Sequence, residues 1–159
     1  MIRTRPFAPG DRAACLAIFD GNVPRFFAPA ERVEFTAFLD RHAGTADHPY
    51  LVLTEAEAVV ACSGLSVEGD GRVSLSWGMV ARHRHGEGLG RLLTATRIAA
   101  AREMAGVTAI TLATSQHTRG FYERLGFAVE SVRPDGFGRG LDRWDMTLFT
   151  AEGRFTGQG

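Results

Sequence analysis

The sequence predicts an α/β fold with a mixed, mostly antiparallel twisted sheet of about seven strands, flanked by four helices. Short apolar segments that alternate or run continuously are typical of strands, and about seven of them occur. The other apolar segments repeat at helical spacing. The order is strand, two helices, three strands, helix, strand, helix and two strands, which favours one sheet covered by helices.

Length and composition indicate a single domain. The 159-residue chain can build one sizeable core, which we place at residues 1–150, and residues 151–159 are expected to form a mobile tail. Eighteen basic residues balance eighteen acidic ones, so we expect neither nucleic acid nor a membrane as a partner. No signal-peptide pattern opens the sequence, and Cys15 and Cys62 make no disulfide framework. A cytoplasmic protein is therefore expected.

The first half predicts an edge strand, two helices and a three-stranded meander. Residues 2–5 alternate and are stopped by Pro6, and Asp11 is a candidate N-cap for the helix that leads to Gly21. A second helix is predicted from about residue 30 to residue 41.

Three strands follow, at residues 50–54, 58–67 and 72–80. Asp70-Gly71 is a hairpin turn signal between the last two. Gly78 inside the third strand predicts a bulge or a close approach of the backbone to a ligand.

The second half predicts a long helix, two strands around a short helix, and a last strand. Apolar residues recur at helical spacing from Leu89 to Met104, and residues 107–114 form the next strand. Residues 118–125 form a short helix that Gly126 stops. A strand begins at residues 127–129, and the last strand covers residues 144–149.

A glycine-rich loop, His85-Gly86-Glu87-Gly88-Leu89-Gly90, joins the third meander strand to the long helix. Glycines let backbone amides approach a ligand, and a helix start attracts phosphate through its unpaired N–H groups and partial positive charge. A dinucleotide fingerprint and a P-loop both need glycine where this chain has Arg91. The loop therefore predicts a phosphate site of another kind, the alternative being a structural turn.

Two stretches resemble the signatures of the GNAT acetyltransferase superfamily. Residues 77–93 resemble its acetyl-CoA-binding motif, which reads Gln or Arg, two residues, Gly, one residue, then Gly or Ala. Residues 120–127, in which Tyr122 precedes Gly126-Phe127, resemble its second signature. With the element order, the resemblance spans about residues 2–149. It implies a GNAT-like fold and acetyl-CoA as co-substrate.

The resemblance also assigns roles to residues. Tyr122 is expected to be the general acid that protonates the leaving thiolate, and the amide of Met79 or Val80 to bind the thioester carbonyl. His85 stands where the motif carries Gln or Arg, and Ser115 where many members carry Asn. The expected acetyl-CoA-binding residues are Met79, Val80, Arg84, His85, Gly86, Glu87, Gly88, Leu89, Gly90, Arg91 and Ser115.

The acceptor side is less defined. The resemblance places the first two helices beside the acceptor, so Phe26, Phe27 and Trp77 are candidate contacts, with packing onto the core as the alternative. No base is evident, and the candidates by inventory are Glu34, Glu68, His117 and Asp145, beside a water relay or an amine that arrives neutral. The five histidines have no metal-site spacing, so no metal is expected.

The predicted function is transfer of acetyl from acetyl-CoA to a primary amine by direct attack on the thioester. The acceptor is expected to be a small-molecule amine or a protein N-terminus, and a homodimer is a further expectation. The alternatives are a CoA-binding sensor or regulatory module with little or no catalysis, and a phosphate-ligand domain unrelated to CoA.

Overall fold

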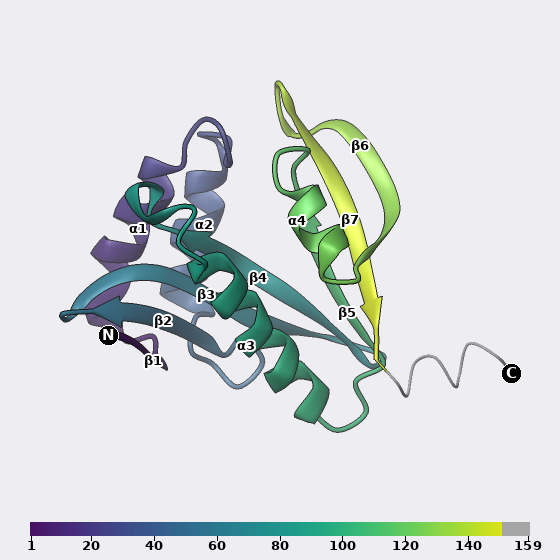
Figure 1. Cartoon of the computed structure of the whole chain (residues 1–159), viewed down its shortest axis with the longest axis horizontal. Helices are drawn as coiled ribbons and strands as arrows, with labels where there is room; N and C mark the ends of the chain where they lie inside the picture. The colour runs from purple at the N-terminus through teal and green to yellow at the C-terminus, as the bar shows by residue number, and fades with distance from the viewer. Residues whose placement is uncertain (151–159) are drawn as a thin grey trace, which may run out of the picture.

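The computed structural model describes residues 1–150, and the predicted tail at residues 151–159 lies outside them. Seven strands form one mixed sheet, in the order β1-β2-β3-β4-β5-β7-β6 (Figure 1), which confirms the predicted fold class. The strands are β1 (Ile2–Pro6), β2 (Tyr50–Glu55), β3 (Ala58–Gly69), β4 (Arg72–Val80), β5 (Ala109–Thr114), β6 (Ala128–Gly138) and β7 (Leu141–Phe149).

Four helices accompany the sheet, as predicted. They are α1 (Arg12–Gly21), α2 (Glu31–Arg41), α3 (Leu89–Glu103) and α4 (Arg119–Arg124), with short 3₁₀ turns at Pro9–Asp11 and Arg82–Arg84. None of the helices within residues 1–150 combines the length and the hydropathy needed to cross a bilayer.

The two faces of the β2–β4 region carry different helices (Figure 1). Side chains alternate between faces along a strand. Val52 and Cys62 pack with α1 and α2, whereas their neighbours Leu53 and Ala61 pack with Leu89 and Leu93 of α3. The strands are therefore apolar on both faces, which explains their nearly continuous hydrophobic sequences.

The sheet opens between its two central strands. β4 and β5 are parallel and pair only through Arg72, Val73 and Ser74, opposite residues 109–111. Beyond Ser74 the β4 strand has no β5 partner. β5 stays paired with β7 along its whole length, up to Thr114. The second half of β4 therefore presents backbone N–H and C=O groups to the space between the two strands. A ligand can form the hydrogen bonds there that β5 does not form.

A β-bulge lies in this unpaired half of β4, where Gly78 predicted one. Cys62 pairs with Met79 and Gly64 pairs with Ser76, so Trp77 and Gly78 together oppose one residue of β3. Trp77 has a positive φ of 43°, and its carbonyl accepts a 2.7 Å hydrogen bond from the Tyr50 hydroxyl. A buried side chain thus holds the bulge in place.

The predicted start of the last strand needed correction, whereas the strand before it begins at Ala128, within the predicted residues 127–129. β6 and β7 form a long hairpin, and β7 begins at Leu141 rather than at residue 144. The register shifts between Arg133 and Gly138, and Asp135 has a φ of 55°. Proline and glycine in an irregular hairpin hide the alternation on which strand prediction depends.

Asp11 precedes α1, as predicted, but its carboxylate does not cap that helix. It accepts hydrogen bonds from the Ala8 amide at 2.9 Å and from both terminal nitrogens of Arg5 at 2.7 and 2.8 Å. The hydrogen bond from Arg5 lowers the pKa of the Asp11 carboxyl. The residue therefore ties the end of β1 to the turn before α1.

Asp11→Asn is expected to lower the free energy of unfolding by about 1 kcal/mol at pH 7, because a part-buried ion pair is lost. A lowered pKa means that the carboxylate stabilises the fold above its unfolded-state pKa, and this contribution is lost as pH falls through the folded-state pKa. The difference should therefore shrink towards pH 3 in denaturant titrations. Asp40→Asn is the matched control, since the Asp40–Arg12 pair is exposed and should contribute no measurable stability.

Candidate active site

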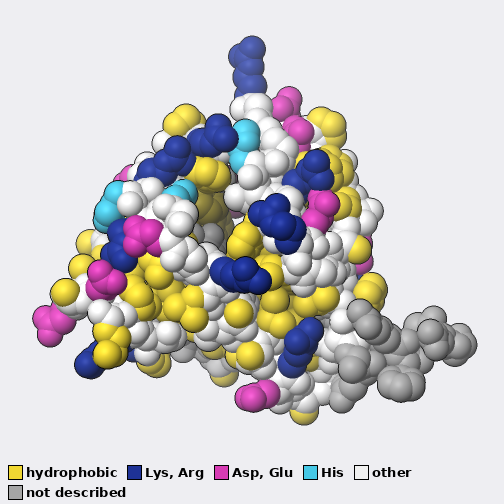
Figure 2. Space-filling view, in the orientation of Figure 1, with side chains coloured by type: hydrophobic (Ala, Val, Ile, Leu, Met, Phe, Trp, Pro, Cys, Tyr) yellow, Lys and Arg dark blue, Asp and Glu magenta, His cyan; other side chains and the backbone are white. Residues whose placement is uncertain are grey.

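A cleft of about 1410 Å³ lies where β4 and β5 separate. The space-filling view shows it as a hollow between the two halves of the molecule, with basic and histidine side chains on its rim (Figure 2). The walls come from the α1–α2 loop, β4, the start of α3, the end of β5, α4 and the β6–β7 hairpin. All the elements that carry predicted site residues therefore meet at one cavity.

The glycine-rich loop has the geometry of an anion site. α3 begins at Leu89, and Gly88 precedes it with a φ of 84°; Gly86 has a φ of 83°. No atom lies within 4 Å of where a Cβ would stand on either glycine, so the backbone faces open space. The first amides of α3 have no intrahelical partner. The expected acetyl-CoA residues that line the cleft are Met79, Val80, Arg84, His85, Gly86, Gly88, Leu89, Gly90, Arg91 and Ser115.

Glu87 is the expected acetyl-CoA residue that the cleft lining lacks. Its carboxylate binds Arg84 at 3.0 Å, and Arg84 also binds Glu55 at 3.2 Å. These hydrogen bonds, the one to Glu55 foremost, raise the pKa of the Arg84 guanidinium. Arg84 is thus shared between two carboxylates, and a pyrophosphate would have to compete with them for it.

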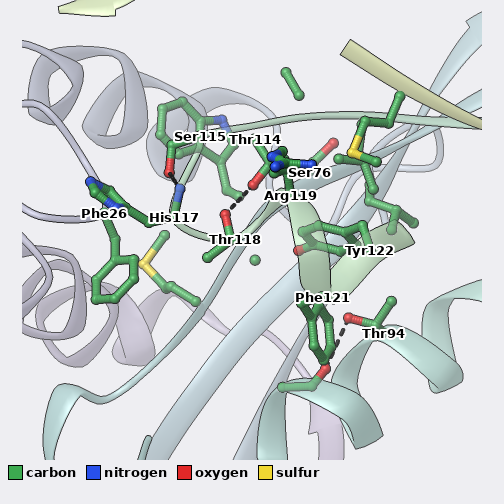
Figure 3. A pocket seen from close by; sticks show the side chains of 18 of the residues that line it. Phe26, Ser76, Thr94, Thr114, Ser115, His117, Thr118, Arg119, Phe121 and Tyr122 are labelled. Carbon is green, nitrogen blue, oxygen red and sulfur yellow. Dashed lines mark hydrogen bonds between the residues drawn. The ribbon is translucent and has the colours of Figure 1, made fainter. Parts of the chain in front are cut away.

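Tyr122 lies on α4 and lines the same cleft. Its ring packs edge-on against Phe121 and Phe127, with centroids 5.1 and 5.9 Å apart. At the end of β5, the Ser115 hydroxyl accepts a 3.2 Å hydrogen bond from the His117 amide. Figure 3 shows Tyr122, Ser115 and Thr94 of α3 in the same pocket. The phenol, the β5 end and the helix start are therefore available to one ligand.

Aromatic side chains form another part of the cleft wall. Phe26 packs edge-on against His85 and His117, with centroids 5.3 and 6.2 Å apart, and the Arg82 guanidinium lies 4.9 Å from its ring centroid. Phe27 stacks on Trp77 at 6.2 Å and is packed onto the core. All three predicted acceptor contacts line the cleft. Phe26 bridges its two walls, a position that the sequence did not indicate.

The four candidate bases also line the cleft. Glu68 accepts a 2.6 Å hydrogen bond from the Ser74 hydroxyl, and Asp145 accepts one of 3.1 Å from Arg143. Glu34 and His117 lie on the α2 and β5–α4 sides of the cleft.

Glu31 is a carboxylate of the cleft that sequence reasoning missed. It is buried at the first turn of α2 and accepts a 2.8 Å hydrogen bond from the Ala28 amide. Burial raises the pKa of its carboxyl above the ordinary value. The available signal was an acidic residue in the first turn of a predicted helix, where it can bond backward to a free amide.

Arg97 is a second residue that was missed. Its side chain belongs to α3, is 2 % exposed and lines the cleft. The signal was spacing: Leu89, Leu93, Arg97 and Ala101 follow at intervals of four and are all buried. Hydrophobic character alone is a poor guide to the buried face of this helix, because Arg97 is buried whereas Leu92 is 42 % exposed.

The described residues hold no group of three or more His, Cys, Asp or Glu side chains that could bind a metal ion. The polar groups that line the cleft include backbone amides, the Tyr122 phenol, arginines and carboxylates.

Comparisons with known proteins agree with this geometry. The sequence profile of the Acetyltransferase (GNAT) family matches residues 15–127. A GNAT-family acetyltransferase structure from Desulfovibrio desulfuricans superposes with a TM-score of 0.78 at 26% identity, covering 94% of this chain and 99% of that one. No curated protein matches the sequence significantly.

Two further structures share the fold over 94% of this chain and 94% of their own. The ribosomal-protein-S18-alanine N-acetyltransferase of Escherichia coli has a TM-score of 0.73 at 22% identity. An acetyltransferase from Salmonella typhimurium, solved with its cofactor acetyl-CoA, has a TM-score of 0.72 at 24% identity. Since the family profile matches well over half of the length of this chain, the chain belongs to the GNAT family of acetyltransferases.

Proposed function

We propose that this protein transfers an acetyl group from acetyl-CoA to a primary amine by direct attack on the thioester. One observation supports this most: the glycine-rich start of α3, the unpaired half of β4 and Tyr122 line one continuous cleft. The first can bind a pyrophosphate, the second can bind an extended amide-containing arm, and the third can donate a proton. Acetyl-CoA carries a pyrophosphate, an amide-containing arm and a thioester, so each of these three groups would have a ligand group to bind.

The amides at the start of α3 would bind the pyrophosphate. Gly86 and Gly88 leave the backbone uncovered, so phosphate oxygens can reach it, and the helix dipole favours their charge. Arg91, which is exposed beside the loop and has no ion pair within residues 1–150, adds a positive charge. The pantetheine arm would then lie along β4 as an additional strand partner.

The chemical step needs a carbonyl-oxygen donor and an acid. A backbone amide at Met79 or Val80, next to the bulge, would donate to the carbonyl oxygen as it gains negative charge. The amine nitrogen bonds to the carbonyl carbon and loses a proton to a base or water, the carbon–sulfur bond breaks, and its electron pair goes to sulfur. The Tyr122 hydroxyl would protonate that sulfur, because an uncharged phenol is a suitable donor at neutral pH.

The acceptor would enter beside the aromatic part of the cleft wall, past Phe26, Phe27 and Trp77. A primary amine with a pKa of about 10.4 is mostly protonated at pH 7 and must lose a proton before it attacks. Glu31 is suited to accept that proton, directly or through water, because its pKa is raised by burial. We propose a small-molecule amine or a protein N-terminus as the acceptor.

Thiol release from acetyl-CoA in the presence of amines tests the function. The panel should contain a polyamine, free amino acids and an alanine-terminated peptide, the last because the E. coli neighbour is an S18-alanine N-acetyltransferase. The chain contains no lysine, so the only amine of its own that can be acetylated is the N-terminus, and mass spectrometry accounts for it. Amine-dependent release is expected. Tight acetyl-CoA binding without release for any amine would favour a sensor over an enzyme.

A further inference from the structure

A buried arginine lies behind the bulge of β4, next to the proposed reaction centre. The Arg97 side chain crosses from α3 towards Gly78, and its exposed fraction is 2 %. A Cβ on Gly78 would stand 2.9 Å from Nη2 and 3.0 Å from Nη1 of the guanidinium. A side chain at position 78 would therefore force the guanidinium to shift, because it occupies the space that a Cβ would fill.

This cation has no acidic partner. None of the ion pairs within residues 1–150 includes Arg97. Two of its hydrogen bonds are long, at 3.4 Å from Nε to the Leu93 carbonyl and 3.3 Å from Nη2 to the Thr94 hydroxyl. A desolvated charge without a counter-ion is costly to bury.

The groups that interact electrostatically with Arg97 come from three elements: Tyr122 of α4, Tyr50 of β2 and Cys62 of β3. Burial lowers the pKa of the guanidinium, and its interaction with Tyr122 is the foremost influence opposing that shift. Arginine nevertheless stays protonated at neutral pH. Of these three groups only Tyr122 lines the cleft, and Arg97 lines it too. The positive charge and the residue proposed to donate the proton therefore face the same cavity.

We propose that Arg97 is a positioning residue for acetyl transfer, whose buried charge beside the β4 bulge stabilises the negative charge left when the carbon–sulfur bond breaks. This inference rests on the proposed function. After bond cleavage the charge lies on the CoA sulfur, or on the Tyr122 oxygen once its proton has moved to sulfur. In both cases it lies beside a cation that had no anionic partner before, in surroundings where water screens it poorly.

Replacing Arg97 should change the stability of the fold and its catalytic role in opposite directions. Replacing Arg97 with methionine removes an unpaired buried charge while keeping a flexible apolar side chain of similar length. The melting temperature of Arg97→Met is therefore expected to rise, by about 2 to 4 °C. A residue kept only for packing would lower the melting temperature when removed.

The deciding experiment measures how many protons are released when CoA or acetyl-CoA binds, and it needs no acceptor amine. CoA and acetyl-CoA are titrated into the protein at pH 7.5 in two buffers of different ionisation enthalpy. A free thiol with a pKa near 8.5 is about one-tenth ionised at this pH. If Arg97 stabilises the charge, CoA binding to the wild type should release at least about half a proton more than acetyl-CoA binding. Acetyl-CoA carries the same phosphates, so their protons cancel in the difference.

Arg97→Met should abolish this extra proton release, and Arg97→Lys, which keeps the charge, should retain part of it. Equal release by wild type and Arg97→Met, or no extra release by the wild type, would overturn the role of Arg97 while leaving the proposed function standing. If Arg97→Met does not fold, Arg97→Lys and Gly78→Ala are measured in its place. The Cβ of Gly78→Ala displaces the guanidinium, so this variant should also reduce the extra proton release. Failure of the wild type to bind either ligand would instead overturn the proposed function.

Discussion

Gly88→Glu should abolish acetyl-CoA binding. Gly88 directly precedes α3 with a φ of 84°, and the space where its side chain would begin is open to the cleft. A glutamate there projects a carboxylate into the position proposed for the pyrophosphate. The block is both steric and electrostatic, and it removes the advantage of the helix start for anions.

Isothermal titration measures this effect directly. Micromolar binding by the wild type corresponds to about 8 kcal/mol, and a loss of at least about 100-fold would place the variant beyond detection at ordinary protein concentrations. Wild-type affinity retained by a folded Gly88→Glu protein would show that the pyrophosphate does not lie at the start of α3.

Gly106→Glu is the matched control. Gly106 lies between α3 and β5, outside the cleft lining, with a φ of 78° and no atom within 4 Å of its Cβ position. Both variants therefore carry the same added charge and a similar backbone strain, roughly 1 kcal/mol for a non-glycine residue in this conformation. Acetyl-CoA binding should survive in Gly106→Glu, so a loss confined to Gly88→Glu reports on the site and not on stability.

Local patterns predicted the parts of the site that are local in sequence. The glycine-rich loop, the helix that follows it and the Asp70-Gly71 hairpin each depend on a few adjacent residues, and all three are present. Gly78 predicted a bulge or a close approach of the backbone to a ligand, and the bulge is present. The space beside Gly78 is occupied by a side chain of this chain, Arg97. A glycine indicates that space is needed without indicating what fills it.

Contacts between distant residues were not predictable in the same way. The ion pair of Arg84 with Glu55 joins residues 29 positions apart, and it decides how far this guanidinium is free for a phosphate. The burial of Arg97 depends on how α3 packs on β3 and β4, strands that are distant from it in the sequence. Charged residues are rarely buried, so a single arginine in an alanine-rich helix favours the wrong assignment.

Tyr122→Phe is expected to lower kcat by about 100- to 1000-fold, since general-acid catalysis contributes this much in comparable reactions. The change removes only the hydroxyl. The ring contacts with Phe121 and Phe127 remain, so the fold and the affinity for acetyl-CoA should be close to those of the wild type. Steady-state kinetics with an amine found in the panel, together with titration of acetyl-CoA, separates the two effects.

The leaving group provides the control for this role. A proton donor matters most when the departing group is basic, and little when it leaves readily as an anion. Tyr122→Phe should therefore lose most of its activity with acetyl-CoA but little with an activated aryl acetate as donor. Equal losses with both donors would show that Tyr122 orients the acetyl group or the amine instead of protonating the thiolate. Turnover within about threefold of the wild type with acetyl-CoA would remove it from the mechanism, and with it the group through which Arg97 is proposed to act.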